Sequence, residues 1–164
     1  AYHTRHGAGP FPTEDVCLST AFPDRYNGTR RWQGDFRVGW FDAVLARYAN
    51  AVSGGADALA VTHLDRLSDI DTWKIATAYD VPRDVRNGRD VYETTPMGDV
   101  CEALTSVLVH AAPVYELVPN NVDAYIAALE RHVGIPVTIR SFGPTAVEKY
   151  MRGVNGWSVS AAVA

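Results

Sequence analysis

Apolar residues recur at helical spacing in two segments of the chain. In the first segment, one face of a 3.6-residue period holds Phe41, Val44, Leu45, Tyr48 and Val52. This pattern predicts a helix over 40–53, and the glycines at 54 and 55 supply its C-terminal end. In the second segment, the corresponding face holds Tyr125, Ile126, Leu129 and Val133. It predicts a helix over 123–133 that ends at Gly134.

Short apolar runs predict strands. The runs are ALAVT at 58–62, WKIATAY at 73–79 and PVTIR at 136–140. The first run is continuously apolar, which suits a strand that is buried on both faces of its sheet. The segment 100–112 fits either a helix or a strand, and we favour the helix. A capping-box spacing between Thr145 and Glu148 predicts one more helix, which runs to about residue 152.

The remaining segments are rich in residues that form turns. Glycine and proline predict loops at 3–14, 22–38 and 80–90. Residues 1–152 then form one domain, and we expect a loose tail over 153–164.

The order of these elements indicates the fold class. Because predicted strands alternate with helices, we expect an α/β domain that has a mostly parallel sheet and flanking helices. Sheets of this kind bind ligands at the carboxyl ends of their strands. The loops at 62–67 and 141–145 both follow predicted strands, so they are the first places to look for a ligand.

Composition and charge narrow the function classes. The 164 residues suit one compact domain, and the net charge of −4 gives no overall attraction to nucleic acid or to an anionic membrane. No apolar run reaches the roughly 18 residues that a membrane helix needs. The chain does not begin with a basic region followed by an apolar stretch, so we expect no signal peptide and a cytoplasmic location.

Cysteine and histidine give no sign of metal chemistry. Cys17 and Cys101 are far apart in the sequence, and we expect both to be reduced, small, buried side chains. The five histidines show no zinc-ligand spacing, so we expect no metal site. The carboxylates of Glu14, Asp42 and Glu116 form no recognisable acid/base couple, and we expect each to be structural.

Five segments resemble the adenylosuccinate synthetase family, in the order of that family and spanning residues 1 to about 152. They are AYHTRHGAGPFPTE, GWFDAVLARYA, THLDRLSDIDTWKIATAY, APVYELVP and VGIPVTIRSFGP. The resemblance implies the C-terminal part of the family's P-loop-related α/β fold. It also implies the family's reaction, in which GTP drives the ligation of inosine monophosphate (IMP) to aspartate with Mg²⁺ present.

The resemblance assigns a guanine-binding role to the loop after residue 62. Asp65 stands where the family carboxylate accepts hydrogen bonds from guanine N1–H and the exocyclic amine, which two acceptor oxygens can satisfy. His63 replaces the family lysine, whose stem lies along the purine, and Leu64 lies between the two. The alternatives are an aspartate that caps a turn and a histidine that is purely structural.

Residues after the predicted strand at 136–140 resemble a second guanine-contacting loop. Ser141, Phe142 and Gly143 match this loop, although Phe142 replaces a small polar residue and can crowd the base. Gly143 permits close approach of the backbone to a ligand. The alternative is a plain turn between two elements.

The substrate-binding segments match the family less well. Arg5 and His6 lie in a loop that is near the nucleotide substrate in the family, and Gly34 and Arg37 lie where the family binds aspartate and phosphates. The family's threonine pair is absent there, and Asp35 stands where a cation is expected. Either the substrate differs or this part of the site is inactive.

The chain contains no G-x-x-x-x-G-K-[ST] phosphate loop and none of the family's catalytic residues. It opens without an initiator methionine, so we expect a piece of a longer protein. Three interpretations remain: part of an active synthetase, a subunit of a ligase with an altered substrate that is completed by a partner chain, or a non-catalytic nucleotide-binding or scaffold homologue. The resemblance also makes a homodimer possible.

Overall fold

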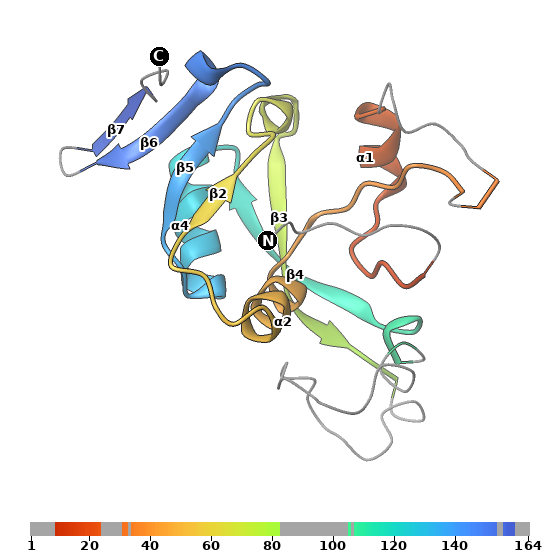
Figure 1. The fold of residues 1–164 in the computed structure, drawn as a ribbon. Helices are drawn as coiled ribbons and strands as arrows, with labels where there is room; N and C mark the ends of the chain where they lie inside the picture. The colour runs from red at the N-terminus through yellow and green to blue at the C-terminus, as the bar shows by residue number, and fades with distance from the viewer. Residues whose placement is uncertain are drawn as a thin grey trace. The chain divides into compact units, whose positions relative to one another are not determined.

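The computed structural model describes residues 9–23, 31–32, 34–82, 105, 107–153 and 156–159. Figure 1 shows the chain, which divides into two compact units. The first unit comprises Ala1–Ser53 and Lys74–Glu116, and the second comprises Gly54–Trp73 and Leu117–Ala164.

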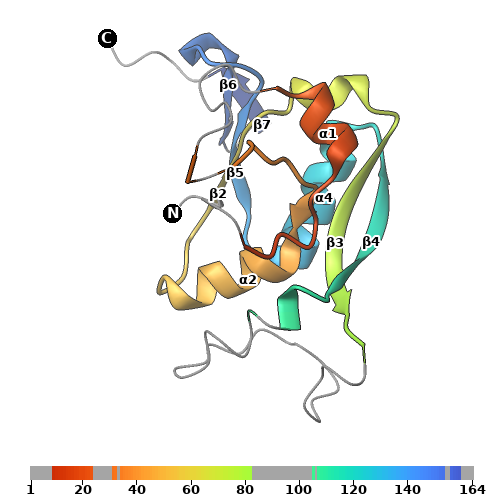
Figure 2. The ribbon, with the colours of Figure 1, turned by 90° about the vertical axis from the view of Figure 1, so that its right-hand side faces the viewer.

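The first unit is built on a three-stranded sheet in the order β1-β3-β4. Its elements are α1 (Val16–Ala21), β1 (Phe41–Asp42), α2 (Ala43–Val52) and most of β3 (Thr72–Asp80) and β4 (Ala112–Pro119). β1 is parallel to β3, with Phe41 opposite Ile75. Figure 2 shows β3 and β4 running side by side as the long strands of this sheet.

Helix α2 begins at a side-chain cap that also ties it to the sheet. Asp42 accepts a hydrogen bond from the Leu45 N–H at 2.9 Å, which satisfies one of the free donors in the first turn. The hydroxyl of Tyr79, on β3, donates to the other oxygen of the same carboxylate. Val44 is buried as predicted, whereas Leu45 and Val52, predicted on the same face, are exposed.

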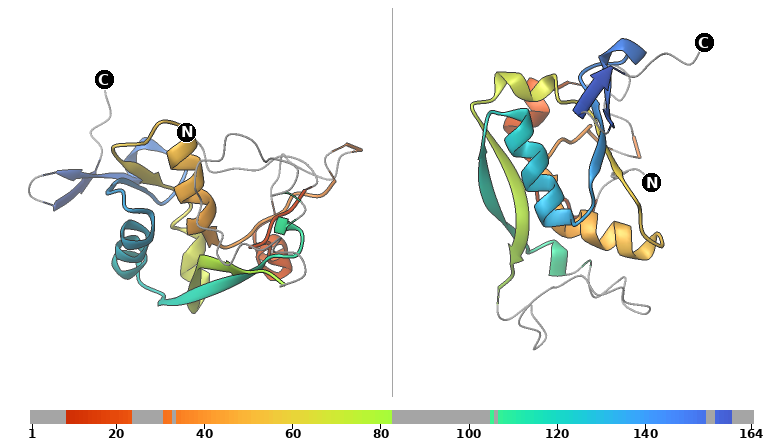
Figure 3. Two further views of the ribbon diagram at one scale, coloured as in Figure 1. Left: turned by 90° about the horizontal axis from the view of Figure 1, so that it is seen from below. Right: turned by 90° about the vertical axis from the view of Figure 1, so that its left-hand side faces the viewer.

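The second unit holds a four-stranded sheet in the order β2-β5-β6-β7. Its strands are β2 (Leu59–Val61), β5 (Val137–Ser141), β6 (Lys149–Gly153) and β7 (Gly156–Val159). Helix α4 (Val122–Val133) lies along this sheet (Figure 3), and two short 3-10 helices, η1 (Arg66–Asp69) and η2 (Ala146–Glu148), follow β2 and β5.

Capping and aromatic packing fix the core of the second unit. Asn121 caps α4 by accepting from the Ala124 N–H at 2.9 Å, and Gly134 ends the helix with a left-handed φ of 78°. The rings of Trp73 and Tyr125 meet edge to face, with centroids 4.9 Å apart. Because the indole N–H of Trp73 donates to the Leu67 carbonyl at 2.8 Å, η1 is anchored to this core.

The α/β class is confirmed, and the sheets are mixed rather than mostly parallel. The β1/β3 and β2/β5 pairs are parallel, whereas β5/β6 and β6/β7 are antiparallel. The predicted helices and strands at α2, α4, β2, β3 and β5 are all present, with ends shifted by a few residues.

Several predictions for the last part of the chain are wrong. The capping box at Thr145 is present, but it starts only the single turn of η2, and β6 replaces the rest of the predicted helix. The loose tail predicted from residue 153 is wrong at residues 156–159, which pair with β6 as β7. The physical reason is the pairing of β6 with β5 and with β7, which the order of apolar and polar residues in this segment does not show.

Other predictions fall partly outside the described residues. The loop predicted at 80–90 is described only to residue 82, and its first residue still belongs to β3. The helix favoured for 100–112 is supported at residues 105, 107 and 108, and β4 begins at residue 112.

Cys17 is exposed rather than buried, and Cys101 lies outside the described residues. Within the described ranges, no helix has both the length and the apolar character needed to cross a membrane.

Candidate nucleotide-binding loops

The two loops predicted to contact a base lie next to each other in the second unit. β2 and β5 are parallel neighbours, with Val61 opposite Arg140, so their carboxyl ends reach the same edge of the sheet. Beyond that edge, the Leu64 N–H donates to the Ser141 carbonyl at 3.1 Å. Residues separated by more than seventy positions in sequence are thus joined by a backbone hydrogen bond.

The first loop makes a tight turn immediately after β2. His63 adopts a φ of 63°, in the left-handed region that non-glycine residues seldom occupy. Its Nδ1 lies 2.9 Å from the hydroxyl of Thr62, and its carbonyl accepts from the Arg66 N–H at 3.1 Å. The Leu64 side chain is buried, so a base can meet only the backbone at this position.

Asp65 keeps its carboxylate on the surface. It stands at the start of η1, yet its side chain makes no capping hydrogen bond, which removes the turn-capping alternative. The side chain is 39% exposed, and its partner is the still more exposed guanidinium of Arg66, at 3.6 Å. An exposed pair of this kind contributes little stability, typically about 0–1 kcal/mol, so the carboxylate oxygens can accept new donors.

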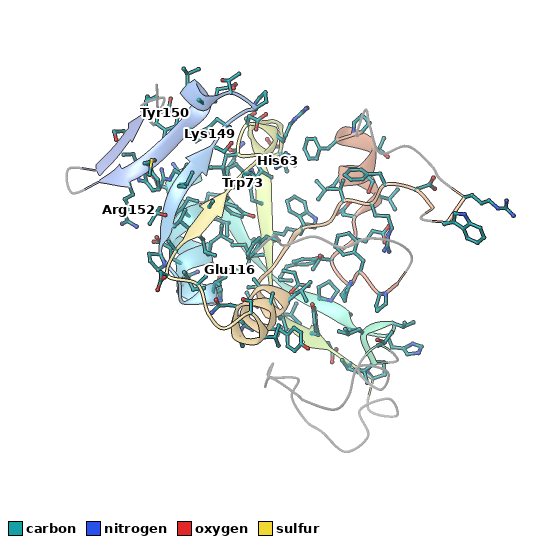
Figure 4. All side chains as sticks on the ribbon, in the orientation of Figure 1. His63, Trp73, Glu116, Lys149, Tyr150 and Arg152 are labelled. Atoms are coloured by element: carbon teal, nitrogen blue, oxygen red, sulfur yellow. The ribbon has the colours of Figure 1, made fainter. Side chains whose placement is uncertain are left out.

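The second loop is held by its own side chains. Ser141 is buried, and its hydroxyl donates to the Gly143 carbonyl at 3.1 Å. The Lys149 ammonium, at the start of β6, donates to the same carbonyl, and Figure 4 labels this lysine. The Phe142 N–H donates to the Glu148 carbonyl at 3.0 Å. Hydrogen bonds from both ends of the loop, at Phe142 and at Lys149, therefore hold it closed.

Phe142, which replaces a small polar residue of the family, packs within the second unit. Its ring meets the ring of Tyr150 edge to face, with centroids 5.6 Å apart. Tyr150 lies on β6 opposite Arg140, and the Arg140 guanidinium stacks 3.8 Å from the centre of the Trp157 ring. These aromatic and cation–π contacts support the loop from the side of β6 and β7.

Glu148 closes over Gly143. A Cβ atom added to Gly143 would clash with Oε1 of Glu148, so any side chain there would displace this carboxylate. The carboxylate accepts from the Thr145 hydroxyl and from the Thr145 N–H, the latter at 2.7 Å. The Thr145 hydroxyl is the main cause that lowers the pKa of Glu148.

In the first unit, the arginine predicted to bind substrate already has partners. The Arg37 guanidinium donates to Glu14 at 3.0 Å and to the Gly9 carbonyl at 3.1 Å, and it lies 5.4 Å from the centre of the Phe11 ring. Gly34 is exposed with a φ of 70°. Arg5 and His6 lie outside the described residues, so their predicted substrate contacts stay predictions.

A cavity of about 650 Å³ adjoins the Arg37–Glu14 pair. Its walls are mostly apolar among the described residues, and they include Phe11, Leu108 and Val109. Among the described residues of this wall, Glu14 and Arg37 are the charged ones, and they are paired with each other.

Two further carboxylates, Asp15 and Asp42, join segments of the first unit. Asp15 caps α1 and accepts from the indole N–H of Trp40 at 2.8 Å, and this indole bond is the main cause that lowers the pKa of Asp15. The Lys74 ammonium lies 5.3 Å from the centre of the Trp40 ring. Burial, together with the Asp42 carboxylate, raises the pKa of Tyr79. The structural role expected of Asp42 is therefore present.

The described residues do not form a metal centre. In the ranges that the structure covers, no three His, Cys, Asp or Glu side chains come together.

Sequence reasoning missed Lys149 and Glu148 as parts of the second loop. Both reach Gly143 only because β6 turns back along β5, and this strand was predicted as helix. The capping-box spacing of Glu148 was the available signal, and it correctly placed the turn but not the strand that follows.

Comparison with known proteins places this α/β architecture in one enzyme family. In fold, the chain matches a solved structure titled "Structure of fully ligated Adenylosuccinate synthetase from Plasmodium falciparum", with a TM-score of 0.70, at 19% identity, covering 90% of this chain and 37% of that one. A family model described as adenylosuccinate synthetase matches residues 1–150. The chain belongs to the adenylosuccinate synthetase family.

Curated relatives agree with this assignment. The adenylosuccinate synthetase of Rhodococcus erythropolis (strain PR4) is 35% identical over 170 residues, covering 93% of this chain and 37% of that protein. That of Streptomyces coelicolor is 36% identical over 157 residues, covering 88% of this chain and 35% of that protein. The chain thus spans little more than a third of the length of these relatives.

Proposed function

We propose that this chain is the guanine-binding, C-terminal part of a cytoplasmic adenylosuccinate synthetase, which ligates IMP and aspartate in purine biosynthesis at the expense of GTP. The observation that carries the proposal is the hydrogen bond from the Leu64 N–H to the Ser141 carbonyl. It brings together the two loops to which the family resemblance assigns the base. Loops on opposite sides of the second unit would have ended the proposal.

The chemistry of Asp65 favours guanine over adenine. Guanine presents two donors side by side, at N1–H and at the exocyclic amine, and a carboxylate presents two acceptors and no donor. Adenine has an acceptor at N1, so its N1 and the Asp65 carboxylate would face each other with no proton to share between them. Because the Asp65 carboxylate is exposed and caps no helix, it is available for this pairing.

The second loop supplies the complementary group. In the part of the chain that the structure describes, the Gly143 N–H has no hydrogen-bond acceptor. A backbone N–H is a donor suited to the guanine O6, and glycine lets a ligand approach closely. The two loops thus present acceptors at Asp65 and a donor at Gly143, which matches the polar edge of guanine.

The remaining steps of the reaction belong to parts of the protein that this chain does not supply. In the proposed reaction GTP phosphorylates the base oxygen of IMP, and the aspartate amine then displaces that phosphate. Phosphoryl transfer depends on positioning and on charge neutralisation of the phosphates. The role that we assign to this chain is to hold the guanine end of GTP, so the 164-residue chain alone should show no ligase turnover.

A second candidate is a non-catalytic nucleotide-binding homologue, or a subunit of a ligase with another substrate. The engagement of Arg37 by Glu14 favours it, because that arginine stands where the family binds aspartate. Adding a separately expressed N-terminal half of a relative distinguishes these candidates. Aspartate-dependent formation of adenylosuccinate by the mixture supports the synthetase, whereas binding without turnover supports the second candidate.

Titration calorimetry of the 164-residue chain with GTP, ATP and IMP tests the proposed base site. We expect weak binding of GTP, weaker binding of ATP, and loss of the difference in Asp65→Ala. Arg66→Ala is the matched control, because it removes the neighbouring cation and leaves the carboxylate in place. Equal binding of GTP and ATP by the unmodified chain would overturn the proposal.

A further inference from the structure

The Gly143 carbonyl receives two side-chain donors from one face of the sheet. Ser141 and Lys149 are directly opposite each other in the antiparallel β5/β6 pair, so their side chains project from the same face. The hydroxyl of Ser141 donates to the Gly143 carbonyl at 3.1 Å, and the Lys149 ammonium donates to the same oxygen. A lysine that bonds a carbonyl in its own loop restrains the backbone directly.

This carbonyl decides the orientation of its whole peptide group. The next residue is Pro144, which has no N–H, so the carbonyl is the single hydrogen-bonding group of the peptide between 143 and 144. With the carbonyl held by Ser141 and Lys149, that peptide plane is fixed. The Gly143 N–H, one peptide earlier, remains without an acceptor among the described residues.

The other side of Gly143 is also closed. The Glu148 carboxylate occupies the position that a Cβ atom would take, and it is held there by Thr145. Glu148 and Lys149 are consecutive residues, so one short segment supplies an anion above the glycine and a cation to its carbonyl. The backbone at Gly143 is therefore restrained from both sides by side chains that follow it in sequence.

The restraint extends to the first loop through Ser141. The Ser141 hydroxyl shares the Gly143 carbonyl with Lys149, and the Ser141 carbonyl accepts from the Leu64 N–H. Leu64 immediately precedes Asp65. A change in the second loop is thus coupled through one residue to the position of the carboxylate on the first.

We infer that Lys149 is a positioning residue of the base site, which holds the Gly143 carbonyl so that the 141–144 backbone and the Asp65 loop present one surface to a purine base. This inference rests on the proposed base site. Lys149 acts through Gly143 and does not itself contact the base. Its side chain is half-buried, and its ammonium is committed to the loop rather than to solvent.

Nucleotide binding by Lys149→Met tests the inference. Because this variant lacks the charge-assisted hydrogen bond to the Gly143 carbonyl, we expect GTP to bind about tenfold more weakly and the preference for GTP over ATP to shrink. Lys149→Arg restores both, because a guanidinium can also donate to the carbonyl. Arg152→Met is the matched control, since Arg152 lies on the same strand and pairs with Glu130 instead. Thermal unfolding of each variant checks that it is folded.

The outcomes separate this inference from the base site itself. If Lys149→Met binds GTP like the unmodified chain while Asp65→Ala loses the preference, the positioning role is wrong and the base site stands. If the unmodified chain shows no preference, both are wrong.

Nuclear magnetic resonance (NMR) of the lysine ammonium groups gives a reading without nucleotide, because the sequence contains only Lys74 and Lys149. A Lys149 signal that is protected from exchange, and that moves with GTP more than with ATP, supports the role. A signal like that of a solvated lysine overturns it.

Discussion

The two units use charged side chains near their loops in opposite ways. In the second unit, the Asp65 carboxylate is paired among the described residues with the exposed Arg66, and Lys149 holds the neighbouring loop. In the first unit, the Arg37 guanidinium is held by Glu14 and by the Gly9 carbonyl. The Asp65 carboxylate can accept hydrogen bonds from a ligand, whereas the Arg37 guanidinium joins segments of its own unit.

This difference is what the departures from the family pattern lead us to expect. The base loops keep the aspartate and the serine and glycine of the family, whereas the segment around Arg37 lacks the threonine pair and carries Asp35. An arginine that is already paired has fewer N–H donors and less unbalanced positive charge to offer a carboxylate or a phosphate. The two base loops therefore match the family pattern more closely than the segment around Arg37 does.

The strongest test of the comparison removes the available carboxylate. Asp65→Asn replaces one acceptor oxygen with a donor, and a lost charge-assisted hydrogen bond costs about 1.5–3 kcal/mol. We expect GTP affinity to fall about 10–100-fold, with little change for ATP. Calorimetry on the 164-residue chain measures both. Unchanged GTP binding would show that the exposed carboxylate is not used.

A smaller effect is expected where the second loop is closed most tightly. In Gly143→Ala, the new methyl group meets the Glu148 carboxylate and must displace it. Such strain typically costs about 1 kcal/mol or more, and we expect GTP affinity to fall about fivefold. Adding Glu148→Ala removes the clash and should restore part of the affinity. A double variant no better than Gly143→Ala would argue against a closed loop.

In the first unit, the hydrogen bond between Asp15 and Trp40 should make the stability of the protein depend on pH under acidic conditions. The indole N–H of Trp40 lowers the pKa of Asp15, so the folded state binds the proton less tightly than the unfolded state. The stability from this pair is present above the ordinary aspartate pKa of about 3.9 and is lost as pH falls through the lowered value. Urea unfolding between about pH 2 and 5 should show a flatter pH dependence for Asp15→Asn than for the unmodified chain. An unchanged slope would mean that Asp15 is not a stabilising carboxylate.

The smallest effect is expected at the engaged arginine. Glu14→Gln removes the ion pair of Arg37, which is partly exposed, so stability should change by less than about 1 kcal/mol. If pairing is what keeps Arg37 from substrate, the variant should bind aspartate or phosphate more tightly than the unmodified chain. The same affinity in both chains would mean that the pair does not limit binding.

The sequence predicts those parts of the fold that local patterns specify. The capped amphipathic helix α4 and the apolar strands β2, β3 and β5 follow directly from periodicity and end signals. The β6/β7 hairpin was missed because residues such as Lys149 and Arg152 give no clear alternation of apolar and polar positions. These strands are stabilised instead by the pairing of β6 with β5 and of β6 with β7. β4 was missed as well, since its prolines at 113 and 119 argue against a strand.

In the candidate site, too, some features follow from local sequence patterns and others depend on how the strands pair. The neighbouring positions of the Asp65 and Ser141 loops were predictable, because both follow strands that a parallel sheet aligns. The role of Lys149 was not, since it depends on the antiparallel register that places it opposite Ser141. The engagement of Arg37 depends on Glu14, which lies 23 residues earlier and was predicted only as structural.

Backbone amide NMR of the 164-residue chain, titrated with GTP and separately with ATP, tests the central claim most directly. We predict that GTP shifts the amide signals of Leu64, Asp65 and Gly143 together, with one common affinity, and that ATP shifts them much less. Shifts confined to one of the two loops, or located outside both, would contradict it.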